Sequence, residues 1–150
     1  MLARELAASL YDKLLETIAE EALFSSPITS SAKYLIVPVP SSKKRSRLRG
    51  YNQAELLAKE LAALNYTLFD FNPQAVVKIK ETKSQVSVKN REKRLQNLRG
   101  AFAVPQREKI RGKNVIIVDD ITTTGATIAE VRKVLLEAGA KCVLGATIAH

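Results

Sequence analysis

An uninterrupted apolar run, VIIV at Val115 to Val118, ends in two aspartates and a threonine-rich turn. A strand exposed on one face alternates apolar and polar residues, whereas this run is apolar at every position. That pattern is typical of a strand buried on both faces of a parallel sheet. Because parallel neighbours require long crossover connections, helices must separate the strands. The run therefore predicts an α/β domain with a mostly parallel, twisted sheet flanked by helices.

The remaining elements alternate as this architecture requires. Apolar residues at helical spacing predict the helices, and short β-branched runs between turn residues predict the strands. The expected helices are 2–24, 52–65, 91–98 and 127–138, and the expected strands are 34–40, 74–80, 101–104, 115–120 and 142–149. The segment 81–90 has no clear period and is expected to be an open loop, 105–113 is expected to be a surface turn, and Gly139 is expected to end the last helix.

The length of 150 residues and the 46% hydrophobic content are sufficient for one core but not for two, so we expect a single domain over 1–150. Its first 30 residues are expected to form a helix and a linker. The net charge of +9 is concentrated in two segments, 33–49 and 78–99, each of which carries +6. A distribution of this kind indicates an anionic partner such as a phosphorylated metabolite, a nucleic acid or a membrane surface.

Several protein classes are not supported by the sequence. No stretch reaches the roughly 18 apolar residues of a membrane span, and the N-terminus lacks the pattern of a secretory signal. The single cysteine, Cys142, cannot form an internal disulfide, so it is expected to be a buried apolar residue in a protein of the reducing cytoplasm. One cysteine also cannot build a zinc ribbon.

The acids and hydroxyls after the apolar run predict a ligand site. In a parallel sheet, ligands bind beyond the carboxyl ends of the strands, where helix N-termini favour phosphate. Asp119 and Asp120 are expected to accept hydrogen bonds from sugar hydroxyls or to hold a cation, and the turn that follows is expected to bind phosphate. The turn consists of Thr122, Thr123, Thr124, Gly125, Ala126 and Thr127. The plainer alternative is that the threonines cap a helix and the aspartates end a strand.

The stretch VIIVDDITTTGAT resembles the phosphoribosyl pyrophosphate (PRPP) motif of type I phosphoribosyltransferases. Neither GxxxxGK[ST] nor GxGxxG occurs, so two other nucleotide-binding motifs are absent. VPVPSSKKRSRLRGYNQAELLA is similar to the VPVP and RGFNQ region of the ComF-type branch, with Tyr51 in place of the usual Phe. TKSQVSVKNREKRLQNLRGAF is also similar to that branch, at Thr82, Gln85, Arg94, Asn97, Ala101 and Phe102. Members commonly begin with a zinc ribbon, for which this chain lacks the cysteines.

The resemblance implies the type I phosphoribosyltransferase fold, with a flexible lid over 80–90. It also implies PRPP as substrate with Mg²⁺ as cofactor, and transfer of the phosphoribosyl group to a nitrogen acceptor that the sequence does not identify. Asp119 and Asp120 are then the catalytic residues and face the ribose. Mg²⁺ is expected to be held through PRPP and not by a dedicated protein metal site, with Asp119 and Asp120 left open as further ligands. The residues expected at the pyrophosphate and in the lid are Ser41, Ser42, Lys43, Arg49, Thr82 and Gln85.

A non-catalytic role remains open beside the enzymatic one. Because the ComF-type branch is associated with natural competence, the chain could be an accessory protein in DNA uptake that binds PRPP, a nucleotide or single-stranded DNA. Aromatic residues are only 5% of the chain, so the stacking surface expected of a single-strand binder is small. The sequence predicts no membrane partner and leaves a homodimer open.

Overall fold

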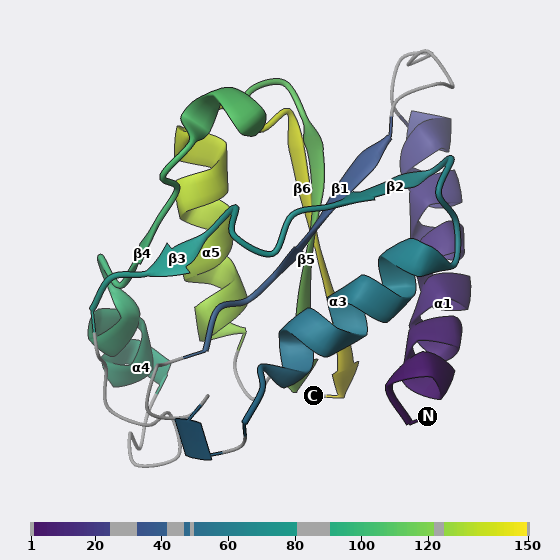
Figure 1. Cartoon of the computed structure of the whole chain (residues 1–150). Coiled ribbons are helices and arrows are strands. Elements are labelled where there is room, and N and C mark those ends of the chain that lie inside the picture. The colour runs from purple at the N-terminus through teal and green to yellow at the C-terminus, as the bar shows by residue number, and fades with distance from the viewer. Residues whose placement is uncertain are drawn as a thin grey trace.

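The computed structural model describes residues 2–24, 33–41, 47–48, 50–80, 91–121 and 125–149. Helices and strands largely alternate along the chain, as the sequence predicts, with β2 as one additional strand (Figure 1). They are α1 (Leu2–Phe24), β1 (Tyr34–Pro38), α3 (Gln53–Ala63), β2 (Phe69–Phe71), β3 (Val77–Lys78), α4 (Arg91–Leu98), β4 (Phe102–Ala103), the 3₁₀ helix η2 (Arg107–Lys109), β5 (Asn114–Ile121), α5 (Ala126–Glu137) and β6 (Cys142–Ala149).

Four of the strands form one parallel sheet in the order β2-β1-β5-β6. The predicted parallel α/β architecture is therefore confirmed. The apolar run that opens β5 lies in the middle of the sheet, paired with β1 on one side and with β6 on the other. In Figure 1 the sheet stands between two layers, with α1 and α3 on one face and α5, α4 and the small β3–β4 sheet on the other.

Alternation along β5 divides the core into two halves. Val115 and Ile117 belong to the half beneath α5, together with Val131 and Leu135 of that helix. Ile116 and Val118 belong to the opposite half, beneath α1 and α3. All four β5 side chains have zero exposed surface. This explains why the run contains no polar residue, because each face of the strand is covered by a helical layer.

Two strand predictions need correction. The segment 74–80 is not a strand of the parallel sheet, because only Val77 and Lys78 are extended and they pair antiparallel with β4. The parallel partner of β1 on that side is β2, a three-residue strand that the sequence analysis did not predict. Its sequence, FDF, is too short to display a reliable period.

Two burial predictions also need correction. Cys142 is partly exposed rather than fully buried, because β6 is an edge strand of the sheet. The expected surface turn 105–113 contains η2 and is exposed except at Ile110, whose side chain has no exposed surface and packs in the α5 half of the core. The side chain of Ile110 therefore fixes this otherwise polar segment to the core.

Candidate functional site

The connections that follow β1 and β5 identify one position in the sheet as a candidate ligand site. After β1 the chain passes through α3 to β2, and after β5 it passes through α5 to β6. These two crossovers leave the adjacent strands β1 and β5 in opposite directions. The carboxyl ends of these two strands are therefore a topological switch point, the place where open α/β sheets bind ligands, and we call it the β1–β5 crevice. Asp119 and Asp120 lie at this position, as the sequence analysis predicts.

The two aspartates lie on opposite faces of β5. Successive side chains of a strand alternate, so Asp119 continues the row of Val115 and Ile117, whereas Asp120 continues the row of Ile116 and Val118. Both are half-buried. The backbone N–H of Asp120 donates to Oδ1 of Asp119 at 2.9 Å, which fixes the orientation of the first carboxylate. The pair therefore presents acceptors toward both layers rather than on one side of the strand.

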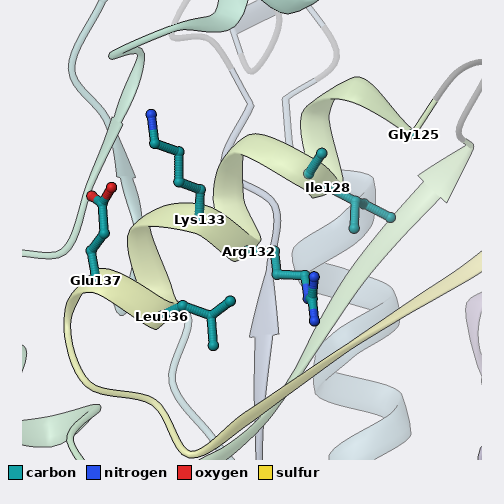
Figure 2. A pocket seen from close by; sticks show the side chains of 7 residues that line it. Gly125, Ile128, Arg132, Lys133, Leu136 and Glu137 are labelled. Atoms are coloured by element: carbon teal, nitrogen blue, oxygen red, sulfur yellow. The ribbon is translucent and has the colours of Figure 1, made fainter.

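The start of α5 lies close to the end of β5. Figure 2 shows Gly125 at the first turn of the helix, near the tip of the strand. Gly125 has φ +73°, a backbone conformation that favours glycine. Among the described residues no atom lies within 4 Å of a Cβ built on it, so lack of space is not the reason for glycine there. The first turn carries no acidic residue, which leaves the positive end of the helix dipole available to an anion.

The remaining residues of the predicted phosphate turn are only partly described. Ala126 is buried and Thr127 is half-buried in the first turn of α5. Thr122, Thr123 and Thr124 lie outside the described residues. Their role in binding phosphate stays a prediction.

The loop after β1 forms the other side of the crevice. The backbone N–H of Val39 donates to the carbonyl oxygen of Val118 at 2.9 Å, so the β1–β5 pairing continues past the end of β1. The half-buried Ser41 follows two residues later, beyond the last register pair of β1 and β5, Pro38 with Val118. Ser42, Lys43 and Arg49 lie outside the described residues.

Asn52 holds this loop to the start of α3, a role that the sequence analysis did not assign. Its Nδ2 donates to the carbonyl oxygen of Val39 at 3.2 Å, and its Oδ1 accepts from the backbone N–H of Ala54 at 3.0 Å. One side chain thus caps a helix and ties that helix to the end of β1. The available signal was asparagine directly before an amphipathic helix, which is a preferred N-cap residue.

The boundaries of the expected lid are held by polar contacts. Nζ of Lys80 donates to the carbonyl oxygen of Arg99 at 3.4 Å, which joins the first residue of the expected lid to the residue that follows α4. The backbone N–H of Gly100 donates to Oε1 of Glu130 at 3.2 Å, and this bond ties the end of α4 to α5. Thr82 and Gln85 lie outside the described residues.

Ionisable side chains at the opposite end of the sheet are not suited to nucleophilic chemistry. Tyr34, Asn114 and Cys142 lie in one row across β1, β5 and β6. Burial raises the pKa of the Cys142 thiol, and Glu21 adds to the rise. Burial also raises the pKa of Tyr34. Because the thiolate is the reactive form, Cys142 is expected to be inert at neutral pH.

A shallow groove runs along the outer side of α5 (Figure 2). It is lined by Gly125, Ile128, Ala129, Arg132, Lys133, Leu136 and Glu137. Nε of Arg132 donates to the carbonyl oxygen of Val143 at 3.4 Å, so this side chain binds to the edge strand. Gly125 is the only lining residue that belongs to the predicted site, and the groove lies apart from the β1–β5 crevice.

The donor set at the crevice is compatible with magnesium. No group of three or more His, Cys, Asp or Glu residues that could hold a metal ion occurs in the described ranges. Mg²⁺ is usually bound by one or two carboxylates together with substrate phosphates and water, and does not require an all-protein cage. Asp119 and Asp120 fit that pattern. Within the same ranges, no helix has the combination of length and hydropathy that crossing a bilayer requires.

Solved structures with the same fold support this description of the sheet. The allosteric regulatory enzyme of purine biosynthesis matches 97% of this chain and 25% of its own, with a TM-score of 0.55 and 19% identity. A hypoxanthine phosphoribosyltransferase from Trypanosoma cruzi matches 96% of this chain and 64% of its own, with a TM-score of 0.51 and 12% identity. At these identities the likeness concerns the fold alone, and the fold is that of type I phosphoribosyltransferases.

Relatives by sequence are more similar. The DNA utilization protein YhgH of Escherichia coli K12 is 36% identical over 108 residues, which is 72% of this chain and 45% of that protein. Competence protein F of Haemophilus influenzae is 35% identical over 69% of this chain and 44% of its own. Competence protein ComFC of Bacillus subtilis is 33% identical over 71% of this chain and 40% of its own. The chain thus spans less than half the length of each of these three relatives.

The model of the phosphoribosyl transferase domain matches residues 49–150, which include both aspartates and the start of α5. The matching region thus contains the part of the crevice that β5 contributes. Together with the crossover geometry and the sequence relatives, this match shows that the chain belongs to the phosphoribosyltransferase family, in its ComF-type branch.

Proposed function

We propose that the crevice between β1 and β5 binds PRPP together with Mg²⁺ and transfers the phosphoribosyl group to a nitrogen acceptor, with release of pyrophosphate. The observation that carries the proposal is the position of Asp119 and Asp120 at the point where the crossovers diverge, one short turn before the glycine that starts α5. Membership of the phosphoribosyltransferase family supports PRPP as the ligand.

The proposed roles follow the chemistry of each part of PRPP. The half-buried carboxylates of Asp119 and Asp120 accept hydrogen bonds from the ribose hydroxyls. The N-terminus of α5 and the threonine turn bind the 5′-phosphate, because the positive end of the helix dipole and the N–H groups of a helix start favour an anion. The loop that contains Ser41 approaches the pyrophosphate. Mg²⁺, held through PRPP, would neutralise negative charge on the leaving group.

In the transfer step the bond between the anomeric carbon and the pyrophosphate oxygen breaks, and its electron pair leaves with the pyrophosphate. A bond forms between that carbon and the acceptor nitrogen, which gives up its proton to solvent. Positive charge develops on the ribose ring in the transition state, so nearby carboxylates stabilise it electrostatically. The protein contributes orientation and charge, and no covalent intermediate with the chain is required.

Calorimetric titration of PRPP tests the binding part of the proposal. We expect Mg²⁺-dependent binding to the natural chain and at least a tenfold loss of affinity in the Asp119→Asn/Asp120→Asn variant. The control is Asp12→Asn/Glu16→Gln, which removes two acids from the exposed surface of α1 and is expected to bind normally. If the natural chain shows no affinity for PRPP with Mg²⁺, or if both variants lose it equally, the proposal fails.

A second candidate function is an accessory role in DNA uptake without turnover. The observation that favours it is the naming of the sequence relatives for DNA utilization and competence. A panel of nucleobases and amines, incubated with the protein, PRPP and Mg²⁺, separates the two functions by the release of pyrophosphate. Release that depends on one acceptor supports the transferase, whereas PRPP binding without release from any acceptor supports the accessory role.

A further inference from the structure

Five basic side chains gather at the end of the sheet opposite to the crevice. We call them the far-end basic cluster, and its members are Arg107, Lys109, Arg111, Lys113 and Lys141. Four belong to the segment that enters β5, and the fifth directly precedes β6. Figure 1 shows η2 at the top of the molecule, whereas β5 and β6 end at the bottom. The cluster lies outside both of the basic segments that the sequence analysis associated with an anionic ligand.

Backbone contacts fix the two segments against each other. The N–H of Gly112 donates to the carbonyl oxygen of Gly139 at 2.8 Å, and the N–H of Lys141 donates to that of Lys113 at 2.8 Å. Cγ of Arg111 lies only 3.3 Å from the position that a Cβ on Gly139 would occupy, so the arginine stem lies over that turn. The buried Ile110 anchors the first segment in the core. The cationic residues are therefore carried by a rigid frame.

The charge of the cluster is not neutralised by ion pairs. All five side chains are exposed, and none makes an ion pair within the part of the chain that the structure describes. Two acids, Glu108 and Glu137, are close to the cluster in the sequence. Glu137 also lies four residues after Lys133, a cation of α5 that is not a member of the cluster. The C-terminal end of a helix favours a nearby cation, so the dipole of α5 explains the position of Arg111, whose stem lies over the turn at Gly139. It does not explain the positions of the other four cations.

We propose that the far-end basic cluster is a second anion-binding surface, which binds the phosphate backbone of a nucleic acid. The five side chains are exposed on a surface rather than enclosed around a cavity, an arrangement that suits a repeating polyanion better than a small phosphorylated metabolite. The segments that carry the cluster contain no Phe, Tyr or Trp from 106 to 114 and from 139 to 142. Binding is therefore electrostatic and independent of base sequence.

The test is a salt titration of binding to a fluorescent thymidine oligonucleotide of about 20 nucleotides. The cluster variant is Arg111→Gln/Lys113→Gln/Lys141→Gln. The matched control is Arg4→Gln/Lys13→Gln/Lys59→Gln, which removes the same charge from exposed positions of α1 and α3. A third variant, Lys43→Gln/Lys44→Gln/Arg45→Gln, removes three cations of a basic segment that the sequence analysis assigned to the pyrophosphate.

We expect the slope of log affinity against log salt to fall by about 2 in the cluster variant, at about 0.7 per phosphate contact. If the affinities converge near ~1 M salt, this corresponds to a loss of roughly 100-fold at ~0.1 M salt. The control is expected to change the slope by less than about 0.5. An unchanged slope in the cluster variant, an equal fall in the control, or a fall confined to the Lys43 variant would each overturn the proposal. Thermal melts establish that all variants are folded, and the readout does not depend on PRPP binding.

Discussion

Replacing Asn52 with alanine should destabilise the protein through two separate hydrogen bonds. The first is the N-cap of α3, in which Oδ1 accepts from Ala54 at 3.0 Å. The second is the bond from Nδ2 to the carbonyl oxygen of Val39 at 3.2 Å. Removing an N-cap costs about 1 kcal/mol, and a net intramolecular hydrogen bond contributes about 1 kcal/mol. We therefore expect the free energy of unfolding to fall by about 2 kcal/mol, with a decrease in Tm of about 4–8 °C.

A second variant separates the two contributions. Asn52→Ser keeps a hydroxyl that can cap α3 but has no amide to reach Val39, so we expect it to lose about half as much stability as Asn52→Ala. Urea unfolding of the three proteins gives the free-energy differences from the transition midpoints at constant m-value. If the alanine variant loses less than about 0.5 kcal/mol, the reasoning from these bonds is wrong. If serine and alanine lose the same amount, the capping part of the argument is refuted.

Three further predictions concern other contacts. Gly125→Ala should lower the free energy of unfolding by about 1 kcal/mol, because the φ of +73° disfavours alanine. Gly125→Asn should lower it less, because asparagine tolerates this conformation. Equal losses of the two variants in urea unfolding would contradict the view that the backbone conformation causes the destabilisation. Glu130→Ala should speed amide hydrogen exchange at Gly100 and in α4 with little change in global stability, and unchanged exchange there would refute the role of its bond to Gly100. Burial raises the pKa of the Cys142 thiol in the folded protein. The stability that the protonated thiol contributes is therefore complete below the ordinary thiol pKa and is lost as pH rises through the folded pKa. In urea unfolding between pH ~8 and ~10, the free energy of unfolding should decline less in Cys142→Ala than in the natural chain.

The sequence predicts the centre of this fold better than its margins. The β5 run is apolar because both of its faces are covered, and α1 and α4 begin and end where their patterns predict. The β2 strand was missed because three residues show no period, and its pairing with β1 depends on a tertiary contact. Cys142 was assigned to the interior because its neighbours are apolar, but a sequence pattern does not reveal which strand lies at a sheet edge.

The candidate site was predictable in composition but not in arrangement. The acids, the glycine and the start of α5 follow one another in the sequence, so their proximity needed no structure. That β1 lies next to β5 is a matter of strand order, which local patterns do not specify. The link between Asn52 and Val39 likewise joins residues that are separated by a loop and approach only in the folded chain.

The opposite directions of the two crossovers have a consequence for how such a protein can diversify. The loop after β1 and the loop after β5 share one floor, formed by the paired ends of these strands, but they lead to different sides of the sheet. Either loop can therefore be lengthened, shortened or exchanged without displacing the other. The chain is in this sense modular at the carboxyl end of its sheet, and loops from a relative can be grafted onto these two strands one at a time.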